Sequence, residues 1–400
     1  MNYRKTLLCS LALATTMGIG ACGSYQSLNI TDEEKNTTQN AIQASALDIG
    51  ERVAQWQIEH LDNFDYLEPR YRIGTAEPRN WIQATFYIGL TRWTETVDDA
   101  NLLAHIQNVA ESVNYEFRTK RDRHADDHAI GQTYLWLAEQ TGEQSPLAFV
   151  QKDFDRILAN PVDVDLELVE VSPKVWGYEG PCQDRWCWAD ALFMAPRVWL
   201  QLSNITGQNK YFDFADAEFW ETADYLFSER YGLFFRDSRY FDALSDNGKP
   251  VFWSRGNGWV FAALPLIIDD LPIDHPSRSR YLALYKKNSA GLLATQNANG
   301  YWPASLLDPS KVKTPEMSGT AFITFGLAWG VNNGILTDDK YTQSVLKGWQ
   351  AIEQGIAENG RVNYVQQVGK SPDPVKKEDT QLYGVGAVLL AASEMTKWSQ

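Results

Sequence analysis

The chain has 400 residues, a formal net charge of −15, and 51 acidic against 36 basic residues. Recognition of nucleic acid requires a concentrated basic surface, so this composition argues against nucleic acid as a partner. Any anionic substrate must be captured by local basic side chains, because the overall electric field of the protein repels it.

The first residues predict export of the protein. Arg4 and Lys5 precede an apolar run over residues 6–21, and this run is too short and wrongly flanked for a membrane span. We therefore predict a secretory signal peptide over residues 1–21. Its removal would take away two positive charges and change the formal net charge from −15 to −17.

The end of this segment resembles the cleavage box of a bacterial lipoprotein. It reads Ile-Gly-Ala-Cys over residues 19–22, and in such proteins the cysteine, here Cys22, becomes the lipid-bearing first residue. Gly23 follows, without an aspartate retention signal, so we expect an anchor in the outer membrane of a Gram-negative bacterium. Residues 22–40 are polar, which predicts a flexible tether. The alternative is an ordinary signal peptide and a chance cysteine.

The cysteine pattern favours one small disulfide loop and no metal. Cys9 would leave with the signal peptide, and Cys182 and Cys187 remain with four residues between them. In an exported protein this spacing predicts a disulfide; the alternative is two free, buried thiols. The sequence has no zinc-type spacing, EF-hand loop, phosphate-binding loop or dinucleotide fingerprint. We therefore predict neither a metal nor a cofactor.

Apolar residues recur at helical spacing along most of the remaining chain. The predicted helices cover residues 40–62, 79–95, 98–118, 127–141, 146–160, 188–206, 209–229, 256–270, 277–298, 317–334, 338–357 and 379–398. Twelve helices pair into six hairpins, and no change in composition divides them. We therefore predict one all-α domain over residues 41–400 with the architecture of an (α/α)6 barrel.

The longest non-helical segments of this pattern are residues 161–187 and 231–255. Functional groups in closed barrels usually lie where the inner helices meet long loops, so residues at the ends of these segments are candidates. Residues 233–237, within the second segment, and residues 300–303 are predicted to be short strands or extended loops over the barrel opening.

Asp190 follows the first of these segments and opens an apolar helix-forming run beside Trp186 and Trp188. Burial disfavours the charged form of a carboxyl group, and a carboxylic acid that keeps its proton near neutral pH can act as a general acid. The alternative is that Asp190 is only a helix N-cap, a position that favours aspartate.

Two further motifs add acid and base groups. Asp126 and Asp127 stand between two histidines in His-Ala-Asp-Asp-His, residues 124–128. Arg255 stands between Trp253 and Trp259 in a glycine-rich turn. Two carboxyl groups can supply an acid and a base, a guanidinium can pair with an anionic group, and flat rings can stack on a sugar, so the set is typical of a site for a sugar acid.

With these motifs in order, the chain resembles the unsaturated glycuronyl hydrolases, specifically the unsaturated rhamnogalacturonyl hydrolases of glycoside hydrolase family 105, which is related to family 88. The resemblance covers roughly residues 45–398. It rests on Asn80-Trp81 and on the motifs at 124–132, 188–196, 232–237, 252–259, 305–309, 316–321 and 383–387. It implies an (α/α)6 barrel, in agreement with the helix pattern.

The resemblance also implies a reaction. Members of the family remove a 4,5-unsaturated uronic acid from the non-reducing end of oligosaccharides that polysaccharide lyases leave. An aspartic acid protonates C4, water adds at C5, and the resulting hemiketal opens and expels the rest of the sugar. Asp190 matches the aspartate that gives the proton and activates water. The second acid is Asp126 or Asp127, and one of the two is expected to cap the following helix.

The implied substrate contacts come from several motifs. Trp253, Arg255 and Trp259 match family positions that contact the unsaturated sugar, and Arg255 is the candidate partner of the uronate, with a structural salt bridge as the alternative. The two tryptophans could instead be core residues. The further candidates from these motifs are Trp81 and His128.

The sequence departs from some relatives, which place histidine near residues 178 and 236. Here these regions read Tyr178-Glu179 and Arg236-Asp237. Arg236 could favour an anionic or sulfated neighbouring sugar, as in ulvan, so the expected substrate is a fragment of either ulvan or rhamnogalacturonan. The competing interpretations are a polysaccharide lyase or inverting glycanase on the same barrel, and a glycan-binding lipoprotein without catalysis.

Overall fold

The computed structural model of the protein describes residues 32–118, 121–171 and 178–399, and their side chains from residue 36 onward. The predicted signal peptide, Cys22 and the first part of the predicted tether lie outside the described residues. Among the described helices, none is both long and apolar enough to span a membrane.

Six helical segments form a closed inner ring in the described part of the chain. They are α3 (Trp81–Val97), α5 (Ala125–Thr141), α7 (Ala191–Met194) continued by α8 (Pro196–Thr206), α10 (Ser254–Asp270), α12 (Met317–Asn332) and α14 (Leu382–Met395). Each segment contacts the next along the chain, and α14 contacts α3, which closes the ring.

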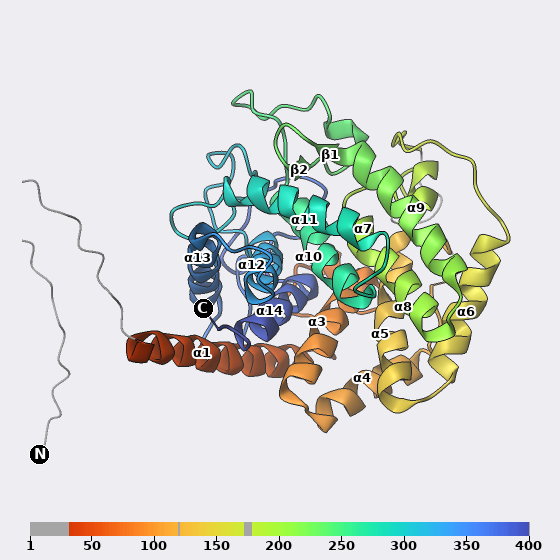
Figure 1. Cartoon of the computed structure of the whole chain (residues 1–400), viewed down its shortest axis with the longest axis horizontal. Coiled ribbons are helices and arrows are strands. Elements are labelled where there is room, and N and C mark those ends of the chain that lie inside the picture. Colours follow the sequence, from red (N-terminus) through yellow and green to blue (C-terminus); the bar gives the residue numbers. More distant parts are fainter. Residues whose placement is uncertain (1–31, 119–120, 172–177, 400) are drawn as a thin grey trace, which may run out of the picture.

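Six outer helices surround this ring. They are α1 (Asp32–Glu59), α4 (Ala100–Ser112), α6 (Ser145–Leu158), α9 (Asn209–Leu226), α11 (Arg278–Leu293) and α13 (Asp339–Gly355). Five of them pack on the inner helix that precedes them, and α1 packs on α14. Figure 1 shows this last pair side by side, α1 in red and α14 in blue. The predicted all-α (α/α)6 barrel is confirmed.

Shorter elements lie in the connections. They are α2 (Pro69–Thr75), the 3-10 helices η1 (Pro181–Arg185) and η2 (Ser238–Tyr240), and the strands β1 (Phe227–Ser228) and β2 (Leu233–Phe234). The strands pair in antiparallel register, Phe227 with Phe234 and Ser228 with Leu233. The extended conformation predicted for residues 233–237 is thus present in β2, whereas residues 300–303 form no strand.

The two layers differ in their sequence pattern for a physical reason. All residues of α14 are buried, because an inner helix is covered by its neighbours in the ring and by an outer helix. The buried residues of α6 are Pro146, Val150, Phe154 and Ile157, which lie three or four residues apart along one face. An apolar stripe of this kind is typical of a helix that packs on one side only.

A close approach of two glycines allows the ring to close between α3 and α14. A Cβ atom on Gly89 would lie 2.3 Å from the carbonyl oxygen of Gly386, and one on Gly386 would lie 2.2 Å from that of Thr85. Only residues without a Cβ atom fit between these backbones.

Several element boundaries differ from the sequence prediction. α1 begins at Asp32, so part of the predicted tether is helical, because its Glu, Lys and Gln residues are good helix formers. The predicted helix over residues 188–206 is divided at Ala195 and Pro196 into α7 and α8, since proline has no N–H to continue the ladder. The end of the predicted helix over residues 209–229 forms β1, and α2 was not predicted.

Candidate active site

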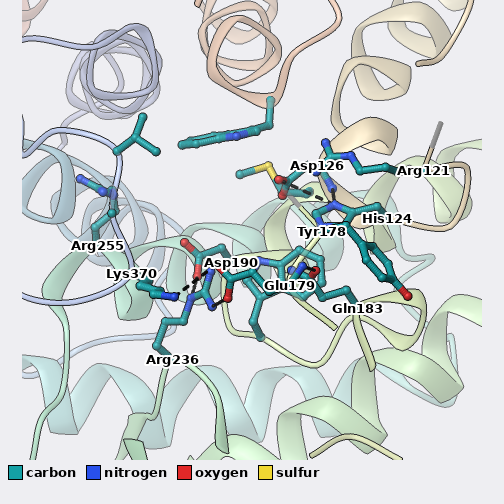
Figure 2. A pocket seen from close by; sticks show the side chains of 15 residues that line it. Arg121, His124, Asp126, Tyr178, Glu179, Gln183, Asp190, Arg236, Arg255 and Lys370 are labelled. Carbon is teal, nitrogen blue, oxygen red and sulfur yellow. Dashed lines mark hydrogen bonds and ion pairs between the residues drawn. The ribbon is translucent and has the colours of Figure 1, made fainter. Parts of the chain in front are cut away.

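A cavity of about 460 Å³ opens at the end of the ring where the inner helices begin. It is lined by Trp81, Arg121, His124, Asp126, Tyr178, Glu179, Gln183, Trp188, Asp190, Met194, Arg236, Arg255, Val368, Gly369 and Lys370. Figure 2 shows the polar side chains around one space, with Asp190 beside Arg236 on one side and Asp126 beside His124 on another.

The helix ends around the cavity carry partial positive charge. Asn80 caps α3 by accepting from the N–H of Ile82, and Glu316 caps α12 by accepting from the N–H groups of Ser318 and Gly319. α5 and α10 also begin here. The N-termini of long helices favour negative groups nearby; that of α12 is already compensated by the Glu316 carboxylate, whereas α3 and α10 begin at the cavity with Trp81 and Arg255 in its wall, and these two ends favour an anion there.

Asp190 lies at the start of α7, but its side chain makes no capping hydrogen bond. The N-cap alternative is therefore not realised. The carboxyl group is 14% exposed, and its Oδ2 lies 3.4 Å from Nε of Arg236. Oδ2 is buried and has no hydrogen-bond partner among the described residues. Burial raises the pKa of Asp190, and the charges of Arg236 and Arg255 oppose this rise.

The structure separates the two adjacent acids of α5. Asp126 lines the cavity, and its side chain is 16% exposed. Burial raises its pKa to about 7; the charge of Arg121 opposes this shift, and the nearby Asp127 and Asp190 add to it. Neither acid is the N-cap, because His124 takes that position and its ring accepts from the N–H of Asp126 at 3.3 Å.

Asp127 does not line the cavity, and its carboxylate is held by an arginine. Arg121 donates to both of its oxygens, at 3.0 Å from Nε and 2.6 Å from Nη2. Asp127 is 1% exposed, and a carboxylate held in this fork is already compensated. The sequence left the second acid open between Asp126 and Asp127, and this geometry favours Asp126.

Arg255 lines the cavity from the first turn of α10 and is 1% exposed. Nη1 donates to the carbonyl oxygen of Gln366 at 2.7 Å and Nη2 to that of Gln367 at 3.0 Å. The guanidinium lies 4.3 Å from the ring centre of Trp253 and 4.7 Å from that of Tyr383. It pairs with no described carboxylate, so the alternative of a structural salt bridge is not realised.

Three of the predicted substrate contacts lie outside the cavity wall and remain predictions. Trp253 and Trp259 are buried and do not line the cavity; Trp253 packs behind Arg255, and Trp259 packs on Phe322. His128 is also buried outside the cavity, where its ring packs among aromatic side chains, and burial lowers its pKa to about 4. In a helical ring, many aromatic side chains fill the space between helices. The motif around an aromatic residue therefore does not show whether its ring lines the cavity or packs in the core.

The remaining predicted contacts, Trp81 and Arg236, do line the cavity. The ring of Trp81 stacks on that of Tyr383 at 5.2 Å. Arg236 is already engaged, because Nη1 donates to Asp237 at 2.7 Å and lies 3.9 Å from Glu179. Its charge is therefore shared with protein carboxylates, which weakens the prediction that it selects an anionic neighbouring sugar.

Sequence reasoning missed part of the cavity wall. The missed polar residues are Arg121, His124, Tyr178, Glu179, Gln183 and Lys370. Glu179 joins the two sides of the rim, since it pairs with Arg239 at 2.8 Å and with Lys370 at 3.5 Å. The signal available in the sequence was the charge of the long loops, which did not distinguish these residues from solvated ones.

The loop before Asp190 is fixed by a disulfide. Cys182 and Cys187 are bonded, which confirms the prediction. Both are buried, and the bond joins η1 to the residue before Trp188. The bond therefore restricts the conformation of the residues just before Trp188 and α7. The described residues contain no cluster of three or more His, Cys, Asp or Glu side chains that could hold a metal.

A helical barrel with two buried carboxyl groups and an arginine in one cavity is suited to a hydrolase that acts on an acidic sugar. Comparison with known proteins gives the family. A profile described as Glycosyl Hydrolase Family 88 matches residues 49–399, and the chain belongs to this family. The resemblance found in the sequence is thereby confirmed.

Individual relatives agree with this assignment. The chain is 54% identical to an unsaturated 3S-rhamnoglycuronyl hydrolase of Alteromonas sp. (strain LOR), over the full length of both chains. It is 34% identical to a protein of the same name from Formosa agariphila, covering 94% of this chain and 95% of that one. A solved family 88 structure from Bacteroides vulgatus superposes with a TM-score of 0.75 at 25% identity, covering 88% and 99% of the two chains.

Burial raises the pKa of both acids, but only Asp127 is held in an arginine fork, so the two are expected to respond differently to substitution. The pKa of Asp126 is about 7 in the folded protein against an ordinary value of 3.8, so its stabilising contribution is complete below about pH 3.8 and is lost as the pH rises through 7. Asp126→Asn should therefore stabilise the protein increasingly between about pH 4 and pH 8, by up to about 4 kcal/mol.

The matched variant is Asp127→Asn, which leaves the guanidinium of Arg121 without its carboxylate fork. It should destabilise the protein by about 3–5 kcal/mol near neutral pH. Denaturant unfolding of both variants at several pH values measures the difference. If the Asp126→Asn variant became less stable relative to the wild-type protein as the pH rises, the raised pKa of Asp126 would be contradicted.

Proposed function

We propose that this hydrolase removes a 4,5-unsaturated uronic acid from the non-reducing end of oligosaccharides left by polysaccharide lyases. The observation that carries the proposal is the cavity in which Asp126 and Asp190 face Arg255, a buried cation without a carboxylate partner among the described residues. The two relatives named unsaturated 3S-rhamnoglycuronyl hydrolases support it.

Arg255 is the proposed partner of the uronate group. A buried guanidinium is costly without an anion, and the carbonyl oxygens of Gln366 and Gln367 hold it without neutralising its charge. A substrate carboxylate would supply the missing charge, and the convergent helix N-termini favour it further. The ring of Trp81 at the cavity wall provides a flat surface for the sugar.

Asp190 is the proposed proton donor. In the reaction its proton forms the new C–H bond at C4 of the unsaturated ring, and the hydroxyl of a water molecule adds at C5. The second proton of that water returns to Asp190. The C5 hemiketal then opens to a ketone by cleavage of the bond between C5 and the ring oxygen, which leaves a hemiacetal at C1. This hemiacetal collapses to an aldehyde, its hydroxyl proton passes to the glycosidic oxygen, and the neighbouring sugar leaves as an alcohol. A buried carboxyl whose pKa is raised by burial suits this exchange, since it keeps its proton longer than a solvated carboxyl and can regain it from the water.

Asp126 is the proposed second acid. With a pKa of about 7, it keeps its proton below neutral pH and can then donate a hydrogen bond to a sugar hydroxyl. The two carboxyl groups influence each other's ionisation, so they titrate as a pair. An incompletely compensated pair of buried acids lowers stability, and such groups are typical of catalytic sites. This favours an enzyme over a protein that only binds glycans.

We also propose that the sugar next to the unsaturated uronic acid is a sulfated rhamnose, as in ulvan fragments. The support is the name of the two relatives, which contains the element 3S-rhamnoglycuronyl. A rhamnogalacturonan-type fragment without sulfate is the competing substrate. Turnover of sulfated and desulfated unsaturated disaccharides by the same preparation would separate the two.

The anchor proposed for the protein is a lipid on Cys22, with the outer membrane as its destination. The support is the cleavage box and the polar residues that follow it. The barrel would then be held close to the membrane.

The first experiment is the ultraviolet absorbance of an unsaturated disaccharide, which reports its conjugated double bond. A hydrolase lowers this absorbance, a lyase acting on polysaccharide raises it, and a binding protein leaves it unchanged. Asp190→Asn preserves shape but cannot deliver a proton, so turnover should fall by about 10²–10⁴-fold. A variant that keeps more than about a tenth of the wild-type rate would exclude Asp190 as the donor.

Arg255→Lys tests the uronate contact. Lysine keeps the charge but loses the planar fork, so kcat/KM should fall by a factor that corresponds to a loss of about 1–3 kcal/mol of transition-state stabilisation. Arg255→Ala should lower kcat/KM further. An analogue in which an alcohol replaces the carboxylate is the control. If both variants bind the alcohol and the acid with equal loss relative to the wild type, Arg255 has only a structural role.

Metabolic labelling with a fatty acid in a Gram-negative host tests the anchor. The wild-type protein should incorporate the label and sediment with the outer membrane, and Cys22→Ala should abolish both. A labelled Cys22→Ala protein would disprove attachment at this residue.

A further inference from the structure

We propose that Arg236 is a positioning residue for Asp190: it holds one oxygen of the Asp190 carboxyl group and keeps a fixed positive charge beside it during the proton transfers. This inference rests on the proposed function, because it assigns Arg236 a part in the same reaction. It replaces the sequence-based prediction that Arg236 binds an anionic group of the substrate.

Arg236 contacts the segment before α7 in two ways. Its backbone carbonyl oxygen accepts a hydrogen bond from the N–H of Ala189 at 2.8 Å, directly before Asp190. Its Nε lies 3.4 Å from Oδ2 of Asp190, and in the described structure neither of these two atoms has a hydrogen-bond partner. The backbone hydrogen bond fixes the position of the residue before Asp190, and the guanidinium of Arg236 lies next to one carboxyl oxygen of Asp190. The other oxygen remains for the reacting atoms.

The guanidinium is held in this orientation from its far side. Asp237 is fully buried and accepts from Nη1 of Arg236 at 2.7 Å. Asp237 also accepts from Nε of Arg239 at 2.8 Å. Burial opposes the ionisation of Asp237, yet the hydrogen bonds and charges of the two arginines keep its pKa below the ordinary value. Rotation of Arg236 toward a ligand would break this contact with a charged, buried carboxylate, so the geometry favours a fixed role.

The charges around Asp190 come from three other parts of the fold. Arg236 and Asp237 approach from the segment after β2, Arg255 from α10, and Asp126 from α5. Under the proposed function the substrate uronate binds Arg255 and offsets its charge. Arg236 is then the cation that still faces Asp190 when its proton has moved to C4 and its carboxylate is exposed to the cavity. Water that adds at C5 returns a proton, and the pair is restored.

The test is the pH dependence of kcat on an unsaturated disaccharide for Arg236→Gln and Arg236→Lys. Loss of the positive charge makes Asp190 a weaker acid. In Arg236→Gln the alkaline limb of kcat should therefore move to higher pH by about one unit, kcat should fall about tenfold or more, and KM should change by less than about threefold. Arg236→Lys should keep the position of the limb, because the charge remains, and still lower kcat.

Arg239→Lys is the matched control. It keeps a positive charge beside Asp237, whose carboxylate holds Arg236, and leaves the contact between Arg236 and Asp190, so the limb should stay in place. An unmoved limb in Arg236→Gln would overturn the proposal. So would a rise of more than about tenfold in KM with kcat unchanged, since that result is expected of a residue that binds substrate.

Thermal unfolding provides a readout that does not need turnover. Asp190→Asn should stabilise the protein more in the Arg236→Gln background than in the wild type at about pH 8, because the buried carboxylate has then lost its cation. Equal stabilisation in both backgrounds would overturn the positioning role. Failure of the wild-type protein to consume any unsaturated disaccharide would refute the proposed function and leave this comparison of stabilities to decide the role of Arg236.

Discussion

The site depends on one architectural constraint, which is that the inner helices begin at the same end of a closed ring. The N-terminal ends of long helices carry partial positive charge, and here they surround one cavity in a protein whose formal net charge is −15. Ring closure also removes water from the carboxyl and guanidinium groups at these ends. An acidic protein thereby obtains a local environment for an anionic sugar, which its overall charge would not provide.

The buried charged groups around the cavity differ in how fully their charges are compensated by protein partners. Asp127 and Asp237 are fully paired with arginines and stabilise the loops around the cavity. Asp126, Asp190 and Arg255 are only partly compensated, and their incomplete pairing is a cost that packing elsewhere must offset. The same residues are the ones that a substrate carboxylate and a transferred proton would satisfy. Neighbouring residues of one motif thus have different roles: Asp127 contributes to stability, and Asp126 is available for the proposed reaction.

The connections give this ring its asymmetry. Residues between β2 and η2 reach back to Asp190, the loop after Gln366 holds Arg255, and Glu179 pairs with basic side chains on both sides of the rim. Each contact joins segments that are far apart along the chain. A change in one loop therefore alters the surroundings of a carboxyl group that belongs to another segment. The disulfide between Cys182 and Cys187 limits movement of the loop before Asp190.

The sequence alone predicted the barrel and the disulfide, and it singled out Asp190 and Arg255, which line the cavity, because helical periodicity, cysteine spacing and local motifs are properties of short stretches. It could not choose between Asp126 and Asp127, since adjacent helix positions differ by a rotation whose meaning depends on the neighbouring helices. It also placed Trp253, Trp259 and His128 at the substrate. Only the tertiary structure decided that these three pack between helices, and that Arg236 faces Asp190, because partners distant in sequence fix the direction of each side chain.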